Sequence, residues 1–339
     1  MAFYRFFSVL LVCSLVGCFC NQRPMERYRE SMEVMGTVVQ VDVCIESYQA
    51  ATVEEAMKKV RKRLREVDFN MSSYNELSSV SSVNRAQGKL VTVSQDTYHV
   101  IRESIRFHGL TQGAFDITVE PFMRLWKESS KINVLPSQEK IQEIQQTTGS
   151  RYIKLLSGHR VQLTHPGARL DLGGIAAGYG VDEAVQILRK NGFKNFMIDL
   201  GGDMYASGQN CYWKPWRIGI KNPVHQERLL DVVALKNSAV TTSGDYEKFV
   251  VIDGKRFSHI IDPETGFPER DVTSATVIAP TAIEADALAT AFCVLKPEVA
   301  IKLVDSMGNG YAATIIARKS EKRVVQYKSA RYSKYQFKF

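Results

Sequence analysis

The chain has 339 residues, of which 45% are hydrophobic and 24% are charged, which excludes a disordered protein and provides for a sizeable core. Its length fits one α/β unit or two closely joined halves. The formal net charge of +8 arises mainly in Lys319 to Phe339, with seven Lys or Arg and one Glu, and the rest of the chain is nearly balanced. The aromatic residues between these charges could suggest stacking on nucleic acid.

The N-terminus carries an export signal. Arg5 precedes an apolar run, Phe6 to Val16, that is too short to span a bilayer, and the run leads into Gly17-Cys18. The tetrad Leu15 to Cys18 resembles a lipobox, in which the chain is cleaved before the cysteine and the thiol of Cys18 is lipidated; a stray cysteine in an ordinary signal peptide is the alternative. We therefore expect an exported protein that is anchored to a bacterial membrane and meets no nucleic acid. The periplasmic side of the inner membrane is the expected place, and an outer membrane is the alternative.

This interpretation sets the predicted domain limits. Residues 1–17 are the signal peptide, 18–30 a polar tether, 31–328 the folded domain and 329–339 a basic tail. The tail is interpreted as a solvated end after a final strand, with contact to an anionic membrane surface as the alternative. Beyond the leader and its junction the cysteines are Cys44, Cys211 and Cys293, whose spacing matches no metal-site pattern. We interpret them as core residues, and whether Cys44 and Cys211 pair stays open.

The first half of the chain alternates strands and helices. Apolar residues at every second position predict a half-buried strand at 37–45, and helical spacing predicts an amphipathic helix at 53–68. Serine-rich 71–84 is predicted to be a loop, and Ser94 is predicted to cap a helix that runs to about Gly109. Further on, the pattern predicts a helix at 138–148, short strands, a helix at 175–190 and a strand at 196–200.

The second half is richer in strands. Asp253-Gly254 lies between two apolar runs, 249–252 and 255–261, which is a strong signal for a hairpin. Strands at 275–278, 312–317 and 323–327 and helices at 283–293 and 297–306 complete the pattern. Because hairpins are frequent, the sequence predicts an α+β fold with mixed, largely antiparallel sheets and flanking helices.

Two segments carry groups suited to phosphate and metal chemistry. Leu170 to Asp182 combines a strand end, the carboxylate of Asp171, two glycines and a helix start, which suits a phosphate site or simply a tight turn. Asp286 and Thr290 stand four residues apart and therefore project from one helical face. Such a carboxylate and hydroxyl suit Mg²⁺, and an ordinary solvated helix face is the alternative.

Three other segments offer polar or aromatic side chains. His259 follows a predicted hairpin strand and precedes a Pro-Gly turn, where it is a candidate base or a structural histidine. Phe115 and Asp116, in Gly113 to Val119, are candidates to clamp a flat ring, with a buried Phe in a strand as the alternative. Thr241 to Tyr246 is predicted to be a polar loop with hydroxyl groups available.

The order of these motifs resembles the ApbE-type flavin transferases, the FAD:protein FMN transferase family, over nearly the whole mature chain. The motifs are Met35-Gly-Thr37, Met71-Ser-Ser-Tyr74, Gly113-Ala-Phe-Asp-Ile-Thr-Val119, Leu170-Asp-Leu-Gly-Gly-Ile-Ala176, Thr242-Ser-Gly-Asp-Tyr246, His259-Ile-Ile-Asp-Pro263 with Gly266, and Ala285-Asp-Ala-Leu-Ala-Thr290.

The resemblance implies a T-fold-like architecture in which FAD lies in a groove between two joined halves. The implied flavin contacts are Met35, Tyr74, Ala114, Phe115, Asp116, Asp171, Ala177, His259 and Ile260. The implied Mg²⁺ ligands are the Gly174 carbonyl, Asp286 and Thr290, together with the pyrophosphate of FAD. Many members carry Lys where this chain has Ala177, so a cation that could help to hold the flavin or its phosphate is missing.

The resemblance also implies a reaction. Mg²⁺ bridges the pyrophosphate and AMP leaves, while His259 acts as general base with Asp262 or a neighbouring group orienting it. The nucleophile is a Thr or Ser hydroxyl of a redox partner protein, and FMN becomes attached to it by a phosphoester. Two alternatives are an FAD pyrophosphatase, which Tyr74 disfavours because its ring should retain FAD by stacking, and a flavin-binding lipoprotein without turnover, which Ala177 keeps open.

Overall fold

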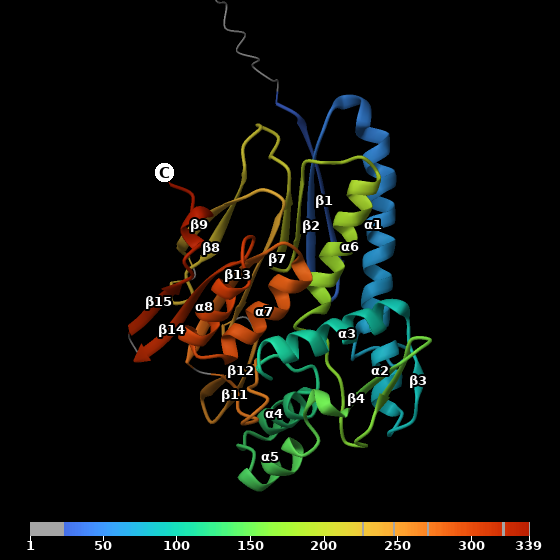
Figure 1. Cartoon of the computed structure of the whole chain (residues 1–339), viewed down its shortest axis with the longest axis vertical. Helices are drawn as coiled ribbons and strands as arrows, with labels where there is room; N and C mark the ends of the chain where they lie inside the picture. The colour runs from blue at the N-terminus through green and yellow to red at the C-terminus, as the bar shows by residue number, and fades with distance from the viewer. Residues whose placement is uncertain (1–23, 226, 247, 270, 321–322, 339) are drawn as a thin grey trace, which may run out of the picture.

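The centre of the protein is an antiparallel sheet of eight strands (Figure 1). A computed structural model describes residues 24–338 except for 226, 247, 270 and 321–322. The predicted leader, Cys18 included, lies outside these residues. No helix in this described part is long and apolar enough to cross a membrane. The strands, in order across the sheet, are β1 (Glu26–Val34), β2 (Thr37–Ile45), β6 (Phe196–Leu200), β7 (Asp203–Ser207), β10 (Ser238–Gly244), β13 (Val272–Ala279), β14 (Ala312–Ser320) and β15 (Arg323–Lys328).

Helices cover one face of this sheet. The helices α1 (Ala50–Met71), α6 (Ala176–Lys190) and α7 (Ala282–Val294) pack against the strands, and α8 (Pro297–Ser306) packs on β14. Helix α3 (Gln95–Leu110) packs on α1 and α7. Val43 on β2 and Val277 on β13 belong to the main core on this face, whereas their neighbours Cys44 and Ile278 belong to a second core on the other face. Alternate side chains of one strand point to opposite faces of the sheet and therefore pack in different cores.

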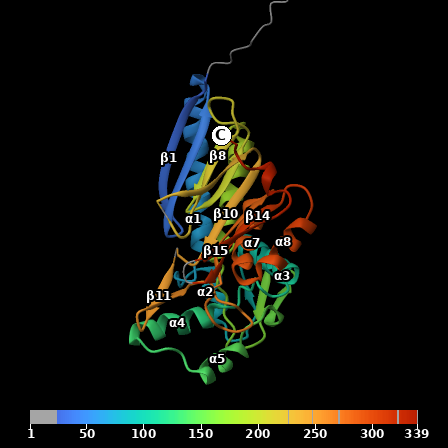
Figure 2. The same cartoon turned by 90° about the vertical axis from the view of Figure 1, so that its left-hand side faces the viewer.

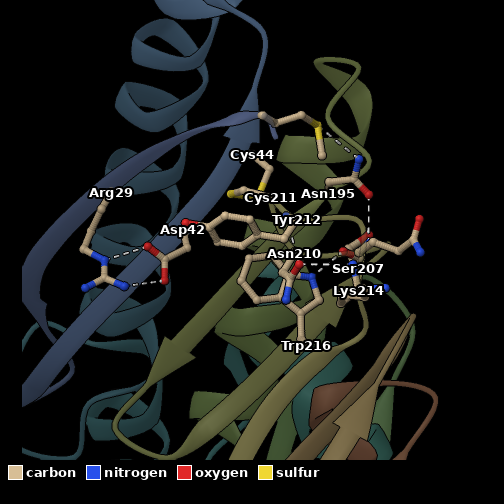
Figure 3. Close-up of a disulfide and its surroundings, with 12 residues drawn as sticks. Arg29, Asp42, Cys44, Asn195, Ser207, Asn210, Cys211, Tyr212, Lys214 and Trp216 are labelled. Carbon is tan, nitrogen blue, oxygen red and sulfur yellow. Dashed lines mark hydrogen bonds and ion pairs between the residues drawn. A yellow bond between two sulfur atoms is a disulfide. The ribbon is translucent and has the colours of Figure 1, made fainter. Parts of the chain in front are cut away.

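The second face is covered by a hairpin, β8 (Trp216–Lys221) with β9 (Leu229–Leu235), and by the C-terminal residues around the short helix η3 (Tyr332–Lys334). A disulfide joins Cys44 of β2 to Cys211 in the loop after β7 (Figure 3). Cys44 and Cys211 therefore lie in the core as predicted, and the pairing that the sequence left open is present.

The end of the chain is part of the fold, and the predicted solvated tail at 329–339 is wrong for most of these residues. The Tyr332 side chain is completely buried. The Tyr335 carbonyl accepts a hydrogen bond from the Ala234 amide at 2.7 Å, and the Phe337 amide donates to the Val232 carbonyl at 2.8 Å. Aromatic residues among the lysines pack on the second core, which charge counting alone does not reveal.

A small third core lies at the end of the molecule farthest from the start of β1 (Figures 1 and 2). It joins α4 (Glu120–Ile132), α5 (Gln138–Gln145) and the hairpin of β11 (Phe249–Ile252) with β12 (Lys255–Ser258). Nearby lie the remaining elements, α2 (Ser79–Arg85), β3 (Val91–Thr92), η2 (Ser150–Tyr152), β4 (Ile153–Leu156) and β5 (Arg160–Leu163); η1 (Ser47–Gln49) precedes α1.

The predicted α+β class is confirmed, and β2 and β6 have the predicted limits. Ser94 caps α3 as predicted, because its hydroxyl accepts from the Thr97 amide at 3.1 Å. The loop predicted at 71–84 is wrong after Ser78, where α2 begins, and the polar loop predicted at 241–246 is strand β10 through Gly244. The predicted tether is also too long, since β1 starts at Glu26. Strand β1 was not predicted because many of its residues are charged. One of them, Arg29, pairs with the buried Asp42 of β2 (Figure 3).

Candidate active site

Asp171 ties together the glycine turn and the loop that carries Tyr74. Its neighbours Leu170 and Leu172 are buried, which turns the Asp171 side chain outward between them. Asp171 Oδ1 accepts from the Gly173 amide at 2.8 Å, and Oδ2 accepts from the Ser73 hydroxyl at 3.0 Å. One carboxylate therefore fixes both the turn before α6 and the residue before Tyr74.

The predicted metal ligands are brought together where α6 meets α7. Gly174, just before α6, is so close to α7 that a methyl group on it would lie 3.0 Å from Thr290 Oγ1. Asp286, one helical turn before Thr290, is 4% exposed, and its Oδ2 accepts from the Gly178 amide at 3.0 Å. Gly174 thus lies beside Thr290, and Asp286 on the same helix contacts Gly178 of α6, while the role of these residues as metal ligands stays a prediction from the family resemblance.

The oxygen atoms at this place have the right chemistry for a hard cation. A carboxylate, a hydroxyl and a backbone carbonyl are donors that Mg²⁺ accepts, with further oxygens supplied by water or phosphate. Within the described residues, no cluster of three or more His, Cys, Asp or Glu side chains offers an alternative site. The donor set fits a Mg²⁺ ion that shares its shell with a phosphorylated substrate.

His259 follows β12 and is held by the chain just before β11. Both its backbone amide and its ring Nδ1 contact the Lys248 carbonyl, at 3.1 and 2.9 Å. Because a carbonyl only accepts, Nδ1 carries the proton of the neutral ring and Nε2 keeps a lone pair. Burial lowers the pKa of His259, and the nearby negative charge of Asp171 acts in the opposite direction. The ring is therefore neutral at pH 7, with a basic Nε2, close to the Asp171 turn.

Asp262 does not orient His259, which corrects its predicted catalytic role. Its Oδ1 accepts from the Glu264 amide at 2.9 Å and its Oδ2 from the Thr265 hydroxyl at 2.8 Å. These bonds cap the turn that ends at Gly266, which is an ordinary use of Asp before Pro-x-x-Gly. The neighbouring group that orients His259 is the Lys248 carbonyl, and a backbone group has no sequence signature.

Phe115 and Asp116 support the fold and do not form the predicted clamp. The Phe115 ring is buried and packs edge-to-face on Phe107. Asp116 Oδ1 accepts from the amide and hydroxyl of Thr118, and its Oδ2 accepts from the Ser150 amide and lies 3.1 Å from His108 Nδ1. Both carboxylate oxygens are thus engaged inside the protein.

The contact between His108 and Asp116 changes the pKa of both groups. The hydrogen bond to Asp116 raises the pKa of His108. Burial alone raises the pKa of the Asp116 carboxyl, but the hydrogen bonds from His108 and Thr118 outweigh it and lower the net pKa. Sequence reasoning assigned His108 no role, and its separation of eight residues from Asp116 gives no motif.

The other predicted flavin contacts differ in exposure. Tyr74 is 83% exposed, with Lys127 Nζ of α4 5.5 Å from its ring centroid, so its outer face is available for stacking. Met35 lies in the turn between β1 and β2, and its amide donates to Asp68 at 3.1 Å. Ala114 and Ala177 are half-buried, and the Ile260 side chain is buried in the main core.

Two cavities of the structure lie elsewhere. One, of about 590 Å³, is bounded by α3, α6 and the start of α7 and is lined by Asp96, Asp182 and Thr281, among others. The other, of about 1170 Å³, lies between the β8–β9 turn and the β11–β12 hairpin and is lined by Tyr246 and Ser258, among others. Neither is lined by a predicted flavin or metal residue, so the predicted FAD groove between two halves stays a prediction.

Comparison with known proteins identifies the family. The ApbE family model matches residues 35–315. The chain belongs to the ApbE family. An FAD:protein FMN transferase of Vibrio cholerae is 34% identical over 289 residues, which cover 84% of this chain and 85% of that protein. These matches confirm the resemblance of this ApbE chain to the family that seven sequence motifs had indicated.

Solved structures agree with this assignment. The ApbE protein of Thermotoga maritima superposes with a TM-score of 0.83 at 33% identity, covering 92% of this chain and all of that one. The flavin transferase ApbE of Vibrio cholerae gives a TM-score of 0.82 at 31% identity, with the same coverage. The α+β arrangement described above is the fold of this family.

Proposed function

We propose that this ApbE chain is an FAD:protein FMN transferase that depends on Mg²⁺. It would attach FMN through a phosphoester to a Thr or Ser hydroxyl of a redox partner protein and release AMP. The observation that carries the proposal is the meeting of Gly174, Asp286 and Thr290 at the α6–α7 contact, near a turn whose Asp171 acts electrostatically on His259. Membership of a family whose relatives are named for this reaction supports it.

The metal side of the reaction rests on α7. Asp286, Thr290 and the Gly174 carbonyl would hold the cation, and the FAD pyrophosphate would complete its shell. When bound there, Mg²⁺ would neutralise charge on the pyrophosphate and make AMP a better leaving group. The buried position of Asp286 keeps competing water away from its carboxylate, which strengthens its attraction for a cation.

The proton is handled by His259. Its Nε2 takes the proton of the acceptor hydroxyl as the hydroxyl oxygen forms a bond to the FMN-side phosphorus. The bond from that phosphorus to the bridging oxygen breaks, and its electron pair leaves with AMP. The Lys248 carbonyl holds the tautomer that this step needs, because it occupies the Nδ1 proton. The flavin ring would stack on the exposed face of Tyr74.

The cellular place of the enzyme is part of the proposal. Cys18 would carry the lipid that anchors the mature chain to the membrane, facing the periplasm, where a membrane-bound acceptor would meet it. The disulfide between Cys44 and Cys211 supports export, because such bonds persist in oxidising compartments. Mass spectrometry of protein extracted from bacterial membranes tests this: a mature chain that begins elsewhere than at a diacylated Cys18 contradicts the anchor.

One assay separates the transferase from its alternatives. The protein is incubated with FAD and Mg²⁺, with and without an acceptor protein, while AMP release and acceptor mass are followed. We expect the acceptor to gain the mass of an FMN phosphoester, with AMP released in equal amount and little AMP without acceptor. Rapid AMP release without acceptor would show a pyrophosphatase, and FAD binding without either product would show a flavin-binding protein.

A further inference from the structure

The start of α7 is capped by a different helix. Thr281 occupies the N-cap position, but its side chain makes no cap bond and instead donates to Glu284 at 2.9 Å. The first amides of α7, those of Ala282 and Ile283, donate to the two carboxylate oxygens of Asp182 on α6, at 2.8 and 2.9 Å. A carboxylate at this place satisfies orphan amides and faces the positive end of the helix dipole.

Asp182 is one half of a reciprocal arrangement. Four residues before it on α6, the Gly178 amide donates to Asp286 of α7; four residues before Asp286 on α7 stands Ala282, which donates to Asp182. Each helix thus offers a carboxylate to the other's backbone, one helical turn apart. We call these residues (Gly178, Asp182, Ala282, Ile283 and Asp286) the α6–α7 clasp.

Close approach of the two helices makes the clasp possible. A methyl group on Gly178 would lie 2.7 Å from the carbonyl carbon of Ala282 and 2.8 Å from Asp286 Cβ, nearer than such atoms approach in proteins. The helix backbones are therefore in direct contact at Gly178, and the clasp fixes how far α7 can slide or turn there. Because Asp182 bonds the amides of Ala282 and Ile283, a change at Asp182 acts on the start of α7 at this contact.

The Asp182 carboxylate is held in a buried place by its two bonds to α7. Burial raises the pKa of this carboxyl to about 6, although the hydrogen bonds from Ile283 and Ala282 act to lower it. Its neighbour Glu183 instead pairs with Arg63, at 2.8 Å from Nε. The contribution of Asp182 that the geometry shows is its pair of bonds to the first amides of α7.

We propose that Asp182 is a positioning residue for the metal-binding helix: through the first amides of α7 it sets where Asp286 and Thr290 stand relative to Gly174. The inference rests on the proposed function, since it concerns the same cation. Mg²⁺ needs near-octahedral ligands at about 2.0–2.1 Å, so a small shift of α7 weakens binding steeply. The hydrogen bonds of Asp182 go to the amides of Ala282 and Ile283, which are neither proposed metal ligands nor proposed flavin contacts.

The test compares Asp182→Asn with Glu183→Gln, its neighbour on α6. Asn keeps the size and one acceptor oxygen but presents an amide donor to one α7 amide. Mn²⁺ binding is measured by electron paramagnetic resonance with AMP and without FAD turnover, and the Mg²⁺ concentration for half-maximal acceptor labelling is measured separately. In Asp182→Asn we expect the Kd for Mn²⁺ and the half-saturating Mg²⁺ concentration each to rise about 10-fold or more. Labelling at saturating Mg²⁺ should stay within about 3-fold of wild type. Glu183→Gln should match wild type.

Backbone exchange gives a readout that does not involve the metal. The amides of Ala282 and Ile283 should exchange with deuterium faster in Asp182→Asn than in wild type, while the Gly178 amide should change less. If Asp182→Asn does not fold, Asp182→Ser, which retains a short acceptor, is measured in the same way.

The outcomes separate the inference from the proposed function. A folded variant whose Mn²⁺ affinity and half-saturating Mg²⁺ equal those of wild type overturns the role of Asp182 and leaves the function intact. A fall in labelling at every Mg²⁺ concentration, with metal affinity unchanged, shows a merely structural residue and also overturns it. Wild-type protein that binds neither Mn²⁺ nor Mg²⁺ overturns the proposed metal site.

Discussion

The proposed metal side and the proposed base side of the candidate active site are built differently. The metal side lies on α7, in which ten of thirteen residues are buried, and α7 is locked to α6 by the clasp. The base side follows β12 of a two-stranded hairpin that packs on the small third core, where Phe249 and Val251 are more than two-fifths exposed. His259 is held there by a single backbone carbonyl, that of Lys248.

This difference matches what each side has to do. A cation site needs several oxygens at fixed distances, and such a set is best held by helices packed in the main core. A base needs only one nitrogen within reach of the incoming hydroxyl, and it must be accessible to a protein acceptor. The metal side should therefore respond to substitution by losing binding, whereas the base side should lose rate.

The largest expected effect is on the metal side. Asp286→Ala should abolish acceptor labelling, by about 10³-fold or more, because the buried carboxylate is the only charged ligand among the proposed three. It should also destabilise the protein by about 1–3 kcal/mol, because the Gly178 amide loses its buried acceptor. Labelling is followed by acceptor mass, and stability by urea unfolding.

Asp286→Asn separates these two losses. An amide oxygen can still accept from the Gly178 amide, so most of the stability should return, whereas the charge that attracts the cation is gone. A stable but inactive Asp286→Asn supports a ligand role. Recovery of labelling together with stability would mean that Asp286 acts only through the clasp. It would contradict the assignment of α7 as the metal-binding side.

A smaller effect is expected on the base side. His259→Gln should lower the rate of labelling by about 10²-fold at saturating FAD, with little change in half-saturating Mg²⁺. The base must be neutral to take a proton, and burial lowers the pKa of His259, so the wild-type rate should rise with pH and level off below the ordinary histidine value of about 6.5. The variant should lack this acid limb. A variant that keeps the acid limb, or wild-type activity, removes His259 from the mechanism.

The contrast between the two sides also decides what could be predicted from the sequence. Asp286 and Thr290 could be placed on one face because helical spacing is regular. Gly174 was named as a ligand only through the family resemblance. Asp182 stood in the same motif, but its role depends on which amides of α7 lie opposite it. Contacts between helices distant in sequence, such as α6 and α7, leave no periodic signal.

Elsewhere, local sequence misled the interpretation. Phe115 was predicted to clamp a ring because it stands beside small residues, yet it packs on Phe107, and nothing local distinguishes the two uses. Helix α4 was missed although a signal existed: Pro121 stands in its first turn, and Phe122 and Trp126 recur at helical spacing. That helix completes the third core, which supports the hairpin that ends before His259.

The smallest effect concerns the pair of His108 and Asp116, which supports the segment between the two sides: the Ile117 carbonyl accepts from the Asp171 amide at 2.8 Å. The pKa of His108 is raised, so its contribution to stability is complete below pH 6.5 or so and is lost as pH rises through the raised value. The pKa of Asp116 is lowered, so its contribution is complete above about pH 4 and is lost as pH falls through the lowered value.

The pair should therefore stabilise the protein most between about pH 4 and 6.5. His108→Gln should lower the free energy of unfolding by about 1–2 kcal/mol at pH 5.5 and by less at pH 8.5, as measured by urea unfolding. His225→Gln, which replaces an exposed histidine, serves as the control. Labelling at pH 7.5 should change by less than about 3-fold, because Asp171 keeps its bonds to Gly173 and Ser73. A loss of labelling larger than that of His259→Gln would instead make this segment a third part of the site.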